Sequence, residues 1–274
     1  MRMETVIRSK PVWQLLDFQE IWRYRELFWV FAWRDIKVRY KQTAFGVLWA
    51  LLQPLFSMFV FTIFFGNIAK IPSGELPYAL FVLIGLVFWT YFSGVLTNAS
   101  NSMIENENII KKVYFPRIIL PASKAVVGLI DFAVAFAMTT LVILYFGQTV
   151  HPNIIWLLPL GILVTFTGSM GLGLLIAAIN VKYRDVRYIL PFFIQMLVFI
   201  TPVIYPTNIM RPAFARLMAV NPMTAVVESV RVAVTGSGSV DWGIMIISIV
   251  SSLVLLTVGL LYFRSTERFF ADII

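Results

Sequence analysis

The sequence predicts an all-α polytopic membrane protein with six transmembrane helices, an amino-terminal amphipathic interface helix and short re-entrant helices before the last span. Of 274 residues, 59% are apolar and only 13% are charged, which is too few charges for the surface of a soluble domain. Several apolar runs approach or exceed the roughly 20 residues that cross a bilayer core of about 30 Å. The Lys and Arg residues are also unevenly distributed. Seventeen of the 22 fall in the amino-terminal segment, two connectors and the tail, as the positive-inside rule requires of cytoplasmic segments.

Residues 1–44 are predicted to be a cytosolic lead followed by the interface helix. No small-residue cleavage site follows an apolar stretch there, so we expect no removable signal peptide. Over residues 24–42, apolar and basic side chains form separate helical stripes. The stripes are Trp29, Trp33, Ile36 and Tyr40 on one side and Arg34, Lys37 and Lys41 on another. A basic face beside indole rings is typical of a helix in the headgroup layer.

Residues 45–274 are predicted to form one transmembrane domain with both termini in the cytoplasm. The expected spans are residues 45–66, 78–96, 118–146, 154–181, a fifth that begins near residue 189, and 242–263. Pro54 should kink the first span. Small side chains recur every four residues in the fourth span, which predicts close helix packing. They are Thr165, Ser169, Gly173 and Ala177.

The third span contains Asp131, an ionisable residue at membrane depth. Such a group costs about 2.5 to 3.5 kcal/mol on insertion scales, so it should face protein or water. It is either a structural carboxylate, hydrogen-bonded to neighbouring helices, or part of a path for cargo.

The connector of residues 105–121, ENENIIKKVYFPRIILP, separates the second and third spans. Its acidic and amide residues can cap and charge the start of a short helix. Ile109, Ile110 and Val113 give that helix one apolar edge, and Pro116 ends it. The connector is therefore either a solvated turn or a docking element for a cytosolic partner.

The fifth span meets Pro202 and Pro206, so its outer end cannot be a regular helix. The next apolar segments, 213–220 and 223–234, are too short to cross a membrane, and Asn221 with Pro222 predicts a capped start for the second. Helices of this kind are typical of re-entry from the outer face, where surrounding protein covers their ends. Glu228 and Arg231, three residues apart, can pair.

Three motifs together resemble the membrane subunit of type-2 ABC exporters. They are KKVYFPRIILP in the connector, RYKQTAFGVLWALLQP from Arg39 to Pro54, and TPVIYP followed by NP at Asn221 and Pro222. The likeness runs from about Phe28 to the end. The chain is most similar to permeases that export lipid-linked polysaccharides such as O-antigen, capsule or teichoic acid.

The resemblance implies a homodimer with a channel at its interface and two ABC ATPase subunits, which hold ATP and Mg²⁺. Residues that would meet the ATPase are Arg34, Asp35, Glu105, Asn106, Glu107, Asn108, Ile109, Ile110, Lys111, Arg184 and Asp185. Candidates for lining the path, or for plain lipid contact or core, are Phe56, Phe59, Phe88, Tyr91 and Phe199. An outer gate, or a cap with no gating role, would comprise Pro202, Pro206, Asn221, Pro222, Glu228 and Arg231. The expected location is the plasma membrane, or the inner membrane of a Gram-negative cell, among membrane lipids.

Other functions find less support in the sequence. No GxxxxGK[ST] motif is present, so nucleotide phosphates need a separate chain, and we expect no cofactor, no metal and no nucleic acid on this one. The order GSMG at residues 168–171 differs from a serine-hydrolase motif, and His151 is the single histidine. Alternatives are a same-family exporter of a drug or small lipid and an ion-coupled carrier that uses Asp131. A membrane enzyme is disfavoured because it lacks a nucleophile, a base and metal ligands.

Overall fold

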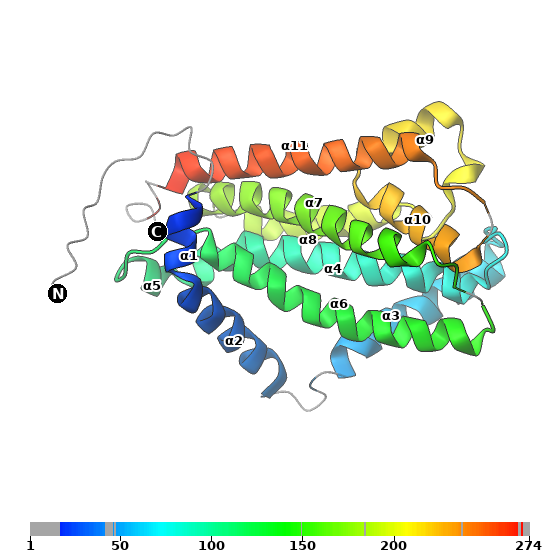
Figure 1. Cartoon of the computed structure of the whole chain (residues 1–274), viewed down its shortest axis with the longest axis horizontal. Helices are drawn as coiled ribbons and strands as arrows, with labels where there is room; N and C mark the ends of the chain where they lie inside the picture. The colour runs from blue at the N-terminus through cyan, green and yellow to red at the C-terminus, as the bar shows by residue number, and fades with distance from the viewer. Residues whose placement is uncertain are drawn as a thin grey trace.

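The computed structural model describes residues 17–41, 46, 48–148, 150–183, 185–236, 238–267 and 270. This part of the chain is a helical bundle (Figure 1). Its α-helices are α1 Phe18–Arg23, α2 Arg25–Lys41, α3 Leu48–Phe61, α4 Tyr78–Glu105, α5 Glu107–Ile110, α6 Ile119–Tyr145, α7 Ile154–Lys182, α8 Val186–Ile200, α9 Pro212–Met218, α10 Met223–Thr235 and α11 Trp242–Glu267. A π-helix, η1, continues α3 over Thr62–Ile68, and a 3-10 turn, η2, spans Thr207–Ile209.

Five helical segments are long and apolar enough to cross a membrane, which confirms the polytopic all-α fold. They are α3 with η1, then α4, α6, α7 and α11. The predicted fifth span is shorter than expected, because α8 has 15 residues and measures about 22 Å at 1.5 Å per residue. The chain leaves the helix at Ile200, as Pro202 predicts, and residues 201–206 continue without helical structure.

The second span is longer than predicted, because α4 continues through the polar residues 98–105. The predicted second span ends at residue 96. The side chains of Ser100, Asn101 and Asn106 instead donate to carbonyl groups four residues earlier in the same helix. Ser100 and Asn106 are buried, and the Asn180 amide of α7 donates to the Ser100 carbonyl at 3.0 Å. Local hydrogen bonds and packing on α7 therefore keep a polar segment helical.

Small residues bring α7 close to two neighbours, as the four-residue repeat predicts. A Cβ added to Gly173 would lie 2.8 Å from the Cβ of Ala99 on α4. On another side, a Cβ on Gly259 of α11 would lie 2.1 Å from the carbonyl oxygen of Gly171. This second contact involves glycines that the repeat did not include. It joins two helices that run in the same direction.

Replacing Gly259 with alanine is expected to destabilise the bundle by about 1 to 3 kcal/mol, because the added methyl group forces α7 and α11 apart. Thermal unfolding of the purified protein in lipid nanodiscs measures the change. Gly94→Ala is the matched control for stability, since no atom lies within 4 Å of a Cβ added there. An unfolding midpoint equal to that of wild type for Gly259→Ala would contradict this account of the contact.

A helix, α2, lies where the interface helix is predicted. Figure 1 shows that α2 runs obliquely to the bundle axis. Its Phe31 and Ala32 pack against the bundle, while Trp29 and Trp33 are about 60% exposed. The indole rings of the predicted stripe thus face outward. Tyr40 belongs to the same predicted stripe, yet its hydroxyl group turns inward to Asp131 of α6.

Helices α9 and α10 form a hairpin bent by 110°, and both of its ends lie at the end of the bundle opposite α5 (Figure 1). At that end the Glu228 carboxylate accepts from the Thr207 amide, and the His151 amide donates to the Ala233 carbonyl. The turn between the helices reaches the middle of α7, where Pro222 packs on Gly168. The chain therefore enters and leaves on one side, which is the geometry of a re-entrant segment.

Candidate functional site

A cluster of charges joins α2, the connector and α6 at one end of the bundle. Lys124 of α6 lies between two carboxylates, with its Nζ 3.1 Å from Asp35 Oδ2 and 2.8 Å from Glu105 Oε2. The side chains of Lys124 and Asp35 are only 16% and 12% exposed, so solvent screens their pair weakly. We call Arg34, Asp35, Glu105, Asn106 and Lys124 the coupling cluster. Four of these residues are among those that the resemblance predicts to meet the ATPase. Lys124 is not among them.

The predicted capping of α5 is wrong, because Asn106 makes no capping hydrogen bond to it. The amide nitrogen of Asn106 donates to the Ser102 carbonyl at 2.8 Å, and its amide oxygen accepts from Arg34 Nη1 at 2.9 Å. Arg34 also donates to Asp35 Oδ1 at 2.8 Å. Tertiary contacts with α2 and α4 thus use the polar atoms that a local cap would need.

The connector presents a polar surface beyond this cluster. The α5 helix ends at Ile110 rather than near Val113. Ile110 is buried and Ile109 is partly buried, whereas Val113 is 55% exposed, so the predicted apolar edge covers only the first two residues. Glu107 and Lys111 pair at 2.6 Å on the exposed side, next to the exposed Asn108.

The second connector also lies at this end of the bundle. Asp185 is exposed just before α8. Arg184 lies outside the described residues. Nearby, Glu267 at the end of α11 accepts a 3.0 Å hydrogen bond from the backbone N–H of Arg117. The carboxyl-terminal helix thereby holds the last part of the first connector.

Arg231 is the best-connected residue of the predicted outer gate. It is buried in α10, and its guanidinium donates to three backbone carbonyl groups. The acceptors are Phe81 at 3.2 Å, Pro202 at 2.9 Å and Val203 at 2.7 Å. The predicted Glu228–Arg231 pair is confirmed at 3.8 Å. Because carbonyl groups outside a helix have no partner in lipid, Arg231 makes the irregular stretch after α8 tolerable.

The start of α10 is capped as the sequence predicts. The side-chain oxygen of Asn221 accepts from the Met223 amide at 3.0 Å, and Pro222 takes helical backbone angles. The Asn221 amide group also donates to the Thr201 hydroxyl at 2.7 Å, which ties the hairpin turn to the end of α8. Pro206 directly precedes η2.

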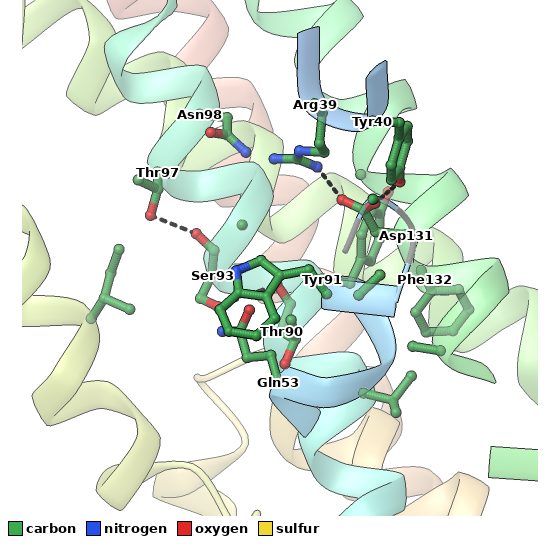
Figure 2. A pocket seen from close by; sticks show the side chains of 18 residues that line it. Arg39, Tyr40, Gln53, Thr90, Tyr91, Ser93, Thr97, Asn98, Asp131 and Phe132 are labelled. Carbon is green, nitrogen blue, oxygen red and sulfur yellow. Dashed lines mark hydrogen bonds and ion pairs between the residues drawn. The ribbon is translucent and has the colours of Figure 1, made fainter. Parts of the chain in front are cut away.

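A cavity of about 390 Å³ lies between α2, α3, α4 and α6 (Figure 2). Asp131 faces this cavity and forms an ion pair with Arg39 and a hydrogen bond with Tyr40. Burial and the hydrogen bond to Asp131 raise the pKa of Tyr40 above its ordinary value. Asp131 therefore faces protein rather than lipid, as expected. Sequence reasoning missed Arg39 as the partner of Asp131, because nothing local relates the two positions.

The candidate path residues fall into two environments. Phe88 is fully buried in the core, where its ring lies 5.0 Å from that of Phe132. Tyr91 is also buried and lines the cavity. Phe56 and Phe59 on α3 and Phe199 on α8 are exposed on the surface of the single chain.

The comparisons with known proteins agree on one family. The ABC-2 type transporter family matches residues 26–235. The O-antigen export system permease protein RfbA of Myxococcus xanthus is 29% identical over 213 residues, which cover 77% of this chain and 81% of the relative. Its counterpart in Klebsiella pneumoniae is 26% identical over 242 residues, covering 88% and 92%. The polysialic acid transport protein KpsM of Escherichia coli is 22% identical over 236 residues, covering 86% and 91%.

Proposed function

Since this chain belongs to the ABC-2 type transporter family, we propose that it is the permease subunit of an ATP-driven exporter of a lipid-linked polysaccharide. The relatives named for O-antigen export and polysialic acid transport support this cargo class. The single observation that carries the mechanism is the coupling cluster. It links the exposed connector to α2 and α6 through contacts of 2.8 to 3.1 Å.

In this proposal ATP and Mg²⁺ are bound by two ABC ATPase subunits beneath the connector end of the bundle. That end faces the cytoplasm, as the positions of the Lys and Arg residues indicate. The exposed surface of Asn108, Lys111 and Asp185 is available to receive the ATPases. The membrane is the plasma membrane, or the inner membrane of a Gram-negative cell.

Two copies of the chain form the path. The exposed aromatic residues of α3 and α8 support this arrangement, because Phe56, Phe59 and Phe199 would otherwise face only lipid. Closure of the ATPases pushes the connector, and the cluster passes the movement to α2. Because α2 carries Arg34 near its middle and Arg39 near its carboxyl-terminal end, a shift of this helix also moves the wall of the cavity at Asp131.

The rival functions find weaker support. An ion-coupled carrier needs a carboxylate that exchanges its ion during the cycle, but Asp131 is paired with Arg39 and bonded to Tyr40. A same-family exporter of a drug or small lipid shares the coupling mechanism, and the named relatives do not favour it.

Replacing Lys111 and Lys112 with glutamate is expected to abolish polymer export while the chain remains in the membrane. Both lysines are exposed on the connector, and reversing their charge opposes docking of the ATPases. Surface polymer on intact cells and co-purification of the ATPase chain are the two measurements. Lys37→Glu, on the exposed side of α2, is the matched control.

Export that continues undiminished in the double variant would reject the coupling mechanism. Transport that survives ATP depletion but stops when the proton gradient collapses would reject the function itself and favour the ion-coupled carrier. Polymer retained inside cells that lack the chain identifies the cargo.

A further inference from the structure

Helix α11 is attached to the end of the first connector. The Glu267 carboxylate accepts from the backbone N–H of Arg117 at 3.0 Å, and the Arg117 guanidinium donates to the Glu267 carbonyl group. The same guanidinium lies 5.7 Å from the centroid of the buried Phe270 ring. Carbonyl groups in the last turn of a helix have no partner within it, and Arg117 satisfies one of them. The connector is therefore held at Arg117 as well as at Glu105, which belongs to the coupling cluster.

The same helix holds the turn of the re-entrant hairpin. The Ser248 hydroxyl donates to the Ala219 carbonyl at 2.9 Å, and the Ser251 hydroxyl donates to the Val220 carbonyl. Both acceptors lie between α9 and α10, outside either helix, and Ser248 and Ala219 are fully buried. A carbonyl group left without a donor inside a membrane is costly, so these two hydroxyl groups fix the turn to α11.

Between these two attachments α11 is an unbroken helix without proline. Figure 1 shows it running along the bundle from the end that carries α5 to the hairpin. Ser248 and Glu267 are about 28 Å apart along its axis, at 1.5 Å per residue. The close approach of Gly259 to the backbone of Gly171 prevents α11 from bending toward α7. Because a regular helix is a rigid element, a displacement at Arg117 reaches the hairpin turn.

We propose that Glu267, Ser248 and Ser251 are positioning residues for export, because they connect the first connector to the re-entrant hairpin through α11. The inference rests on the proposed function, in which closure of the ATPases displaces the connector. That displacement then follows two routes. The coupling cluster carries it to α2, and α11 carries it to the turn that contains Asn221 and Pro222. The turn of the predicted outer gate therefore moves in step with the ATPases.

The experiment follows the hairpin turn with a fluorophore. The chain contains no cysteine, and the Val220 side chain is exposed, so Val220→Cys gives a single site for bimane. The full chain is labelled, joined to its ATPase subunits in nanodiscs, and the shift of bimane emission on adding ATP with Mg²⁺ is measured. Export by the unlabelled variants is measured in cells. Glu267→Met, and Ser248→Ala with Ser251→Ala, are each expected to reduce both the emission shift and export at least about threefold.

Each variant has a matched control on the same helix. Arg264→Met is the control for Glu267→Met, because Arg264 contacts the same carboxylate at 3.2 Å without joining it to the connector. Thr257→Val is the control for the serine variant, because its exposed hydroxyl bonds only within α11. Both controls are expected to keep the emission shift. Glu267→Gln retains an acceptor oxygen for the Arg117 amide and is expected to restore most of the shift.

Losses from the two ends of α11 are expected not to add when the variants are combined, because both interrupt one route. Additive losses, or an unreduced emission shift in either variant, would overturn the proposal. If Glu267→Met does not fold, the serine variant alone decides between these results. An absent shift in a Val220→Cys chain that exports polymer would overturn the proposal and leave the proposed function standing. A normal shift without polymer export would reject the proposed function and leave the α11 connection standing.

Discussion

Replacing Lys124 with methionine is expected to lower polysaccharide export at least about tenfold, equivalent to a coupling free energy of about 1.4 kcal/mol. Lys124 of α6 is the cation between two carboxylates, Asp35 of α2 and Glu105 of α4. Methionine has a similar length and no charge, so the two carboxylates lose their shared partner and repel each other. Movement of the connector then reaches α2 only through the Arg34–Asn106 hydrogen bond. Initial rates of polymer appearance at the cell surface measure the effect.

The same variant is expected to destabilise the chain by only about 1 to 3 kcal/mol, because Asp35 keeps its 2.8 Å contact with Arg34. Lys124→Arg, which preserves the charge, should recover most of the export. Lys37→Met removes a lysine from the exposed side of α2 and serves as the control. If Lys124→Met exports polymer at the wild-type rate from equal amounts of protein in the membrane, the coupling cluster has no part in transmission.

Replacing Arg231 with methionine is expected to lower the amount of folded chain in the membrane at least about fivefold. The substitution leaves the carbonyl groups of Pro202 and Val203, which lie outside any helix, without their donor, and removes the contact with the Phe81 carbonyl of α4. Each unsatisfied buried carbonyl costs about 1 to 3 kcal/mol, and the re-entrant hairpin loses its main attachment to α4 and to the end of α8. Quantitative immunoblots of membrane fractions and thermal unfolding in nanodiscs are the measurements.

Arg231→Lys is expected to have an intermediate effect, since an ammonium group cannot reach three carbonyl groups in the planar geometry of a guanidinium. Arg216→Met on the exposed side of α9 is the control of the same type. Normal folding of Arg231→Met, together with lost export, would indicate a role in the path for cargo rather than in holding the irregular segment.

The candidate site was only partly predictable from the sequence. Arg34, Asp35, Glu105 and Asn106 were named from the resemblance, and the structure brings them together. Lys124 and Arg39 were missed as partners, because nothing local relates residue 124 to residue 35, or residue 39 to residue 131. The signal that existed was the cost of an ionisable group in an apolar run, which applies to Lys124 as it does to Asp131.

The amino-acid sequence by itself determined the membrane class, the long spans, the break at Pro202 and the capped start of α10. These features follow from apolar length and from backbone chemistry within a few neighbouring residues, which the sequence states directly. Only the tertiary structure decided that α4 extends through residues 98–105, that α2 runs along α6, and that Arg231 closes the irregular stretch after α8. In each case a polar group could bond either to a neighbouring residue or to a distant one. Which partner it bonds to depends on which helices pack side by side.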